Sequence, residues 1–185
     1  STKYIGLKTD EIFPYIDTTF EDAKKNLYNK MDIPDFTILN FEYVTKEKSI
    51  QEIEEIVDLN IYNYATKIDN RLVVSINLMN RREDIPMKVT NRKDEIIIRR
   101  SSHEIDSINF ILPNDYLVEK LPEDEYIKSP FGTYQTIINN DGNTISYKRS
   151  FDFNKGIYSP ELYDELREFL IKVSKADFKK FVLLN

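Results

Sequence analysis

The tetrapeptide Asn140-Asp141-Gly142-Asn143, set between two β-rich runs, constrains the fold more than any other feature of this sequence. The flanking runs cover 134–139 and 144–153. Asp-Gly favours a tight hairpin turn in which both central residues have positive φ. The sequence therefore predicts a β-hairpin here. A calcium loop is excluded, because the twelve-residue ligand spacing and the terminal Glu are missing.

Short extended runs separated by turn residues continue along most of the chain. Further strands are predicted at 36–40, 56–62, 72–76, 95–99, 107–112, 116–119 and 181–184. A polar turn is predicted at 46–49, and a loop or a poorly paired edge strand at 80–91. The first three of these runs are expected to form three antiparallel strands in a row. Successive short strands joined by short turns favour an antiparallel sandwich over a parallel sheet.

Two segments have helical periodicity instead. Thr18 followed by Glu21 predicts a capping box for a short helix at 20–31, which Pro34 ends. Ser159 and Pro160 predict the start of a longer helix, as N-cap and first helical residue. The apolar face of this second helix consists of Leu162, Leu166, Phe169, Leu170 and Val173.

The predicted fold is therefore mainly β: an antiparallel β-sandwich, immunoglobulin-like in its general architecture, with a short N-terminal helix and a longer helix near the C-terminus. Residues 1–35 are interpreted as an N-terminal segment with the short helix, and 36–185 as the sandwich domain with the C-terminal helix. A chain of 185 residues can bury a core without a disulfide or a metal.

Composition excludes several classes of chemistry. The chain has no Cys and one His, which excludes a cysteine nucleophile, a thiolate metal site and a three-histidine zinc site. We predict no cofactor and no membrane span. A net charge of −6 argues against nucleic-acid binding. The pairs Arg81-Arg82 and Arg99-Arg100 are interpreted as solvated strand ends rather than phosphate sites.

His103, the only histidine, is the one candidate for proton transfer at neutral pH. Its neighbours Ser102 and Glu104 would point to the opposite face of an extended strand, so we interpret His103 as a surface-loop residue. Runs of carboxylates occur at 52–55 and 123–125. A hydrolase would need two of them to converge within about 5–10 Å, and a solvated face is the simpler interpretation.

Twelve Tyr and eleven Phe leave one further hypothesis open, an independent carbohydrate- or protein-binding module. It requires a contiguous strip of exposed aromatic side chains on one sheet face. Tyr is also a favoured strand residue, so most of these side chains are expected in the core or in cross-strand pairs.

The C-terminal part of the chain resembles a known family. The runs that carry the resemblance are Phe110-Ile111-Leu112-Pro113, Tyr116-Leu117-Val118-Glu119-Lys120-Leu121-Pro122, Ser129-Pro130-Phe131-Gly132-Thr133-Tyr134, Tyr147-Lys148-Arg149-Ser150-Phe151 and Gly156-Ile157-Tyr158-Ser159-Pro160-Glu161-Leu162-Tyr163. In order and spacing this series resembles the C-terminal domain of unknown function that follows a transglutaminase-like core in exported bacterial proteins.

The resemblance implies a non-catalytic accessory domain in the periplasm or at the cell surface. Its partner would be the neighbouring transglutaminase-like domain of the same polypeptide, with a protein or a glycan as a further possibility. The family's papain-like Cys, His and Asp lie upstream, so no catalytic, cofactor-binding or metal-binding residue carries over. Structural roles are expected for the motif residues Pro113, Pro122, Pro130, Phe131, Gly132, Tyr134, Arg149, Gly156, Tyr158, Tyr163 and Phe169.

Overall fold

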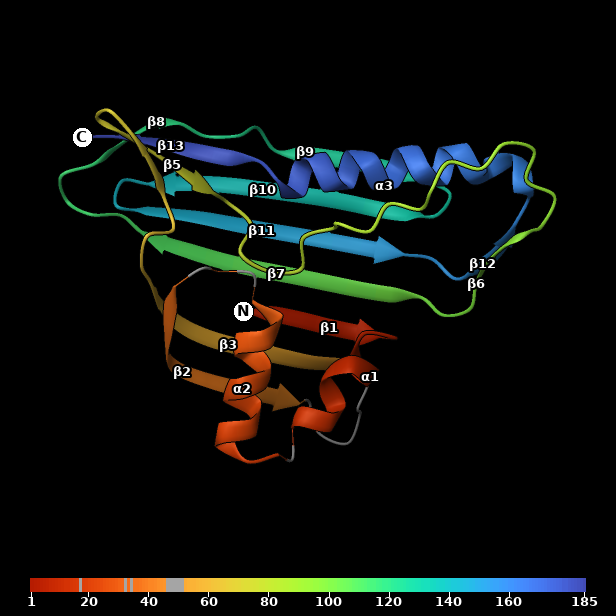
Figure 1. Ribbon diagram of the computed structural model, residues 1–185, viewed down its shortest axis with the longest axis horizontal. Helices are drawn as coiled ribbons and strands as arrows, with labels where there is room; N and C mark the ends of the chain where they lie inside the picture. The colour runs from red at the N-terminus through yellow and green to blue at the C-terminus, as the bar shows by residue number, and fades with distance from the viewer. Residues whose placement is uncertain (17, 32, 34, 46–51) are drawn as a thin grey trace.

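The computed structural model describes residues 1–185 apart from 17, 32, 34 and 46–51 (Figure 1). Pro34 and the polar turn predicted at 46–49 lie outside the described residues. The elements are β1 (Thr2–Gly6), α1 (Thr9–Ile12), η1 (Phe13–Tyr15), α2 (Phe20–Lys30), β2 (Phe36–Thr45), β3 (Glu52–Ile61), β4 (Thr66–Ile68), β5 (Arg71–Ser75), β6 (Ile96–Ile98), β7 (Ser102–Ile111), β8 (Leu117–Lys120), β9 (Glu125–Ser129), β10 (Gly132–Asp141), β11 (Thr144–Phe153), β12 (Gly156–Tyr158), η2 (Pro160–Leu162), α3 (Tyr163–Asp177) and β13 (Lys180–Leu184).

A long antiparallel sheet forms one layer of the molecule. In the described part of the chain its strand order is β2-β3-β1-β7-β11-β10-β9 (Figure 1). The expectation of three consecutive strands in a row is wrong, because the run at 72–76 belongs to another sheet. The position beside β3 is taken by β1, which pairs with both β3 and β7. The pattern of the first residues did not predict this strand.

A smaller antiparallel sheet of order β4-β5-β13-β8 covers one end of the long sheet. Phe181 and Leu183 of β13 share a buried cluster with Ile145 and Tyr147 of β11. Two sheets therefore pack face to face, and the predicted mainly β, antiparallel fold is confirmed. The strands β6 and β12 form a separate two-stranded pair.

Helices cover the rest of the same face. Four of the five predicted stripe residues, Leu166, Phe169, Leu170 and Val173, are buried in one cluster with Tyr134 of β10 and Phe151 of β11. The fifth, Leu162, belongs to η2 rather than to α3 and is half-buried. Leu27 of α2 packs in a cluster on β2 and β3. Figure 1 shows α3 running alongside β9 and β10, with α1 and α2 over the other end of the sheet.

Two local predictions need correction. The N-cap of α2 is Thr19 rather than Thr18: the Thr19 hydroxyl oxygen accepts from the Asp22 backbone N–H at 3.2 Å. The Thr18 hydroxyl donates to the Tyr15 carbonyl at 2.9 Å. The predicted hairpin is present, but its loop is Gly142 and the residue after it, and in this loop only Gly142 has positive φ, at 58°.

The first strand of the chain, β1, is part of the long sheet. Because β1 lies inside the long sheet, residues 2–6 share backbone hydrogen bonds with β3 and β7. The domain division after residue 35 nevertheless stays a prediction. No helix in the described ranges is long and apolar enough to cross a membrane.

Candidate functional site

A cluster of buried charges occupies the middle of the covered sheet face. Alternate residues of β11, including Arg149 and Phe151, point to that face. The β7–β11 register places Arg149 opposite Asp106 and Phe151 opposite Glu104. The guanidinium of Arg149 therefore lies among carboxylates rather than in solvent, and the residue is only 1% exposed.

Arg149 binds three carboxylates. Its Nη1 lies 2.8 Å from Asp106 Oδ2 and 3.3 Å from Glu104 Oε2. Its Nε lies 2.8 Å from Asp177 Oδ1. Burial by itself lowers the pKa of the Arg149 guanidinium, but the three carboxylates together hold that pKa well above its usual value. The group is therefore a permanent cation. We call these four side chains the Arg149 network.

Asp177 joins the layers of the molecule. It is the last residue of α3, where the helix dipole disfavours a negative charge. Donors from the loop after β5 and from β10 offset this cost. Its carboxylate accepts from Asn77 Nδ2 at 3.0 Å, from the Tyr134 hydroxyl at 2.7 Å and from the Arg82 backbone N–H at 2.9 Å. Together with Arg149, these contacts attach the end of α3 to the long sheet and to the loop after β5.

Asp106 forms the second junction of the network. Its Oδ1 accepts from the Thr2 hydroxyl at 2.6 Å and from Asn80 Nδ2 at 2.8 Å. Nearby, the Tyr4 hydroxyl donates to buried Glu55 at 3.3 Å. Burial, reinforced by the negative charge of Glu55, raises the pKa of Tyr4 far above its usual value. The polar centre therefore extends from α3 across β11 and β7 to β1 and β3.

A polar hollow of about 290 Å³ opens beside the network. Four parts of the chain line it: the residue before α1, the loop that follows β5, strand β7 and strand β11. The lining residues are Lys8, Asn80, Arg81, Arg82, Glu83, Asp84, Glu104, Arg149 and Phe151. The interpretation of Arg81-Arg82 as a solvated strand end is wrong, because both residues are partly buried in a loop that crosses the covered face.

His103 lies within strand β7, so its interpretation as a surface-loop residue is wrong. On the open face of the sheet its Nδ1 lies 2.5 Å from Asp152 Oδ1. The Thr133 hydroxyl donates to the other oxygen of Asp152 at 2.8 Å. Glu104 points to the covered face, as alternation predicts. Thr133 and His103 each bind the Asp152 carboxylate and do not bind each other. The Thr133 hydroxyl therefore has no histidine base beside it to make it a nucleophile.

The carboxylate runs do not produce a paired acid–base site. In the run at 52–55, Glu55 is buried next to Tyr4, contrary to the solvated interpretation, while Glu54 binds Lys3 on the other face. In the second run, Glu125 binds Lys179 at 2.5 Å. Among the described residues, three carboxylates converge on Arg149. Starting the β7 prediction at residue 102 would have placed two of them on the covered face.

Several motif residues meet in the core beneath α3. Phe131, Tyr134 and Phe169 belong to one buried cluster, and Tyr158 and Tyr163 pack against it. A Cβ at Gly132 would lie 1.9 Å from the Asp152 carbonyl oxygen, and one at Gly156 would lie 2.7 Å from the Tyr158 ring. The Tyr163 hydroxyl donates to the Met87 carbonyl at 2.9 Å.

The remaining motif residues lie in two other places. Tyr134 and Arg149 converge on Asp177. The prolines lie at turns and strand ends, where Pro113 accepts from the Tyr116 N–H and Pro122 follows β8. Pro130 lies between β9 and β10. The expectation that all these residues are structural stays a prediction.

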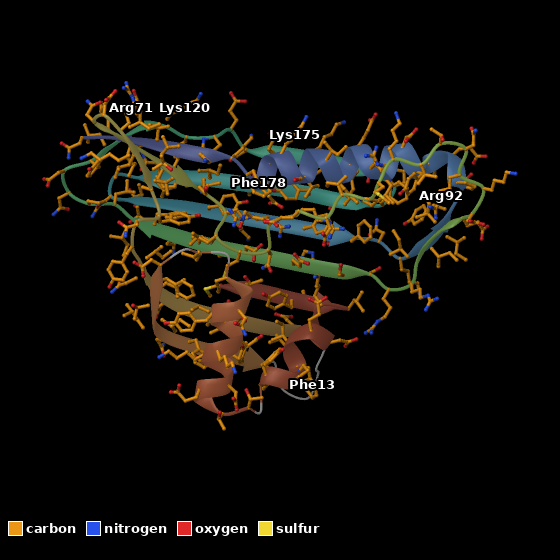
Figure 2. All side chains as sticks on the ribbon, viewed as in Figure 1. Phe13, Arg71, Arg92, Lys120, Lys175 and Phe178 are labelled. Atoms are coloured by element: carbon orange, nitrogen blue, oxygen red, sulfur yellow. The ribbon has the colours of Figure 1, made fainter. Side chains whose placement is uncertain are left out.

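The exposed aromatic side chains do not form a strip. Those at least 40% exposed are Phe13, Tyr28, Tyr62, Tyr126 and Phe178. They come from different elements, and Figure 2 shows Phe13 beside α1 and Phe178 far from it, at the end of α3. The condition set for an independent aromatic binding face is therefore not met among the described side chains.

Residues 70–183 match the family DUF3858, described as a "Domain of Unknown Function with solved-structure structure". The chain belongs to the DUF3858 family. The match runs from the start of β5 into β13 and includes the whole Arg149 network. A comparison with curated proteins finds no match.

One solved structure has a similar fold. It is the crystal structure of "a putative protease from Parabacteroides distasonis", with a TM-score of 0.51 and 16% sequence identity over 66% of this chain. The matched part spans 25% of the length of that protein. At this identity the likeness concerns the fold alone.

Proposed function

We propose that this chain is a non-catalytic accessory domain of a larger exported bacterial protein that carries a transglutaminase-like domain of the papain-like cysteine peptidase superfamily. The observation that carries the proposal is DUF3858 membership, together with a fold shared with one quarter of a much longer protein described as a protease candidate. The motif series quoted from the sequence supports the same assignment.

The polar centre is consistent with a supporting role. Its three carboxylates are at most 7% exposed and are bound by Arg149, which leaves them poorly placed for general acid–base catalysis. The sequence contains no Cys to act as the superfamily's nucleophile. The neighbouring domain of the same polypeptide is the partner that this proposal names, and the periplasm or the cell surface is its compartment.

The size and location of the native polypeptide test the proposal. An antibody against this domain, used on fractionated cells of the source organism, is expected to detect a band much larger than 22.0 kDa in the periplasmic or membrane fraction. A cytoplasmic band near 22.0 kDa would contradict the proposal and identify a free-standing protein.

The purified chain tests the non-catalytic part separately. Incubated with unfolded casein and with an amine donor, it is expected to release no peptides and to form no cross-links. Turnover that is retained through purification and abolished by Glu104→Gln would identify an enzyme and overturn this part of the proposal.

A further inference from the structure

Arg82 lines the polar hollow beside the Arg149 network, and its guanidinium is not one of the ion pairs of that network. The Arg82 backbone N–H donates to Asp177, which fixes the loop over the sheet. The Arg82 guanidinium carbon lies 5.9 Å from the centre of the Phe151 ring. Its Nε is buried and has no hydrogen-bond partner among the described residues. Because this atom has no accessible surface, an acceptor in the hollow would have to bind the guanidinium through its Nη groups, and no carboxylate among the described residues pairs with that guanidinium.

The neighbouring cations have partners of their own. Arg149 is saturated by its three carboxylates. Lys8 Nζ lies 3.2 Å from Glu11 and 3.7 Å from Glu104. The Arg81 guanidinium lies 5.2 Å from the centre of the Phe178 ring. Arg82 is therefore the cation in this hollow best placed to take a new anionic group.

The charge and size of the hollow narrow the class of ligand. Glu83, Asp84 and Glu104 line it together with the cations, so a doubly charged anion would be repelled more strongly than a single carboxylate. A planar carboxylate also matches the fork of a guanidinium. A volume of about 290 Å³ is at the lower end of ligand pockets, enough for a chain end or one side chain.

We propose that this hollow binds one carboxylate group, with Arg82 as its anchor. The carboxylate is the C-terminus of a peptide or the side chain of an acidic residue. This site is distinct from the ion pairs of the Arg149 network, and the inference does not depend on the proposed accessory function.

Titrations of the ¹⁵N-labelled chain followed by NMR test the proposal. The probes are N-acetylglycine for a chain end and the α-amide of N-acetylglutamic acid for a side chain. N-acetylglycinamide and the α-amide of N-acetylglutamine are their uncharged controls. At least one carboxylate is expected to produce saturable shifts at the Arg82 Nε–H and at backbone amides 80–84, with a Kd of about 1 mM. The probe that saturates identifies the source of the carboxylate.

Two substitutions assign the effect to Arg82. Arg82→Gln is expected to weaken binding at least tenfold, whereas Arg99→Gln, at an exposed arginine, leaves it unchanged. Should Arg82→Gln fail to give a folded spectrum, Arg82→Lys keeps the charge without the fork and is expected to weaken binding several-fold. The proposal is overturned if neither carboxylate saturates, if the amides bind equally, if inorganic phosphate binds more tightly, or if the Arg82 variants bind normally.

Discussion

Two regions of the covered sheet face sit side by side and are held together in opposite ways. Beneath α3, Phe151 and Phe169 belong to an apolar cluster. On strand β11, two residues before Phe151, Arg149 lies among three carboxylates. The apolar cluster depends on buried area and tolerates changes that keep its volume. The Arg149 network depends on every member being present, because removing one leaves buried charges unpaired.

Removal of Arg149 gives the largest expected effect. Arg149→Met leaves Asp106, Asp177 and Glu104 buried without their cation, and should reduce the free energy of unfolding by about 5 kcal/mol. This is comparable to the total stability of many domains, so loss of folded protein is a consistent result. The measurement is urea unfolding followed by circular dichroism. Lys148→Met, one residue away on the open face, is the control, and equal midpoints for the two variants would contradict the ionic description.

Substitutions in the apolar cluster should lower the free energy of unfolding by less than Arg149→Met does. Their cost should grow with the side-chain volume that is removed. Phe169→Ala is expected to cost about 3–4 kcal/mol, because it leaves a cavity under α3, whereas Phe169→Leu should cost about 1 kcal/mol. The exposed substitution Glu168→Ala on the same helix is the control. If Arg149→Lys lowers the free energy of unfolding by no more than Phe169→Leu does, the contrast between the apolar cluster and the Arg149 network is wrong.

Tyr134 belongs to both regions and gives a pH-dependent test. Burial, reinforced by Asp177, raises the pKa of Tyr134 far above its usual value of 10. Above pH 10 the unfolded chain therefore releases a proton that the folded chain keeps. The contribution of Tyr134 to the free energy of unfolding is therefore complete below pH 10. Above pH 10 it falls by about 1.4 kcal/mol per pH unit, as it does for any tyrosine whose pKa is raised in the folded chain.

Tyr134→Phe should therefore have two effects. At pH 7 it should cost about 2 kcal/mol, the value of a hydrogen bond to a charged group. Between pH 10 and 11 the variant should lose stability less steeply than the unsubstituted chain, because Tyr134 no longer contributes. Some loss should remain, since the pKa values of Tyr4, Tyr43 and Tyr147 are also raised. Identical slopes in urea unfolding at pH 8–11 would show that Tyr134 ionises without unfolding.

The smallest expected effect lies at the solvent end of the network. Lys8 Nζ is 3.7 Å from Glu104, but the Lys8 side chain is 32% exposed. Lys8→Met should change the free energy of unfolding by no more than about 0.5 kcal/mol. If Lys8→Met lowers the free energy of unfolding nearly as much as Arg149→Met under the same conditions, burial does not determine how strongly a charged residue here contributes to stability.

The same contrast explains how much the sequence could predict. The stripe of α3 was predictable, because Leu166, Phe169 and Val173 recur at helical spacing. The hairpin was predictable from Gly142. Arg149 was predictable only as a structural motif residue. Its carboxylate partners were not predictable, since they come from β7 and the end of α3 and each reads as an ordinary surface charge. Asp177 is the polar last residue of α3, and only the folded chain reveals the five donor groups around it.

The central position of β1 affects the order in which the molecule can fold. Its Thr2 bonds Asp106, 104 residues away, and Asn77 bonds Asp177, 100 residues away. Contacts of such long sequence separation form slowly, because loop closure must precede them. During synthesis, Arg149 can gain its Asp177 partner only after the end of α3 has been made. Completion of this domain is therefore a late event, and a chain truncated before residue 177 would lack the acceptor that closes it.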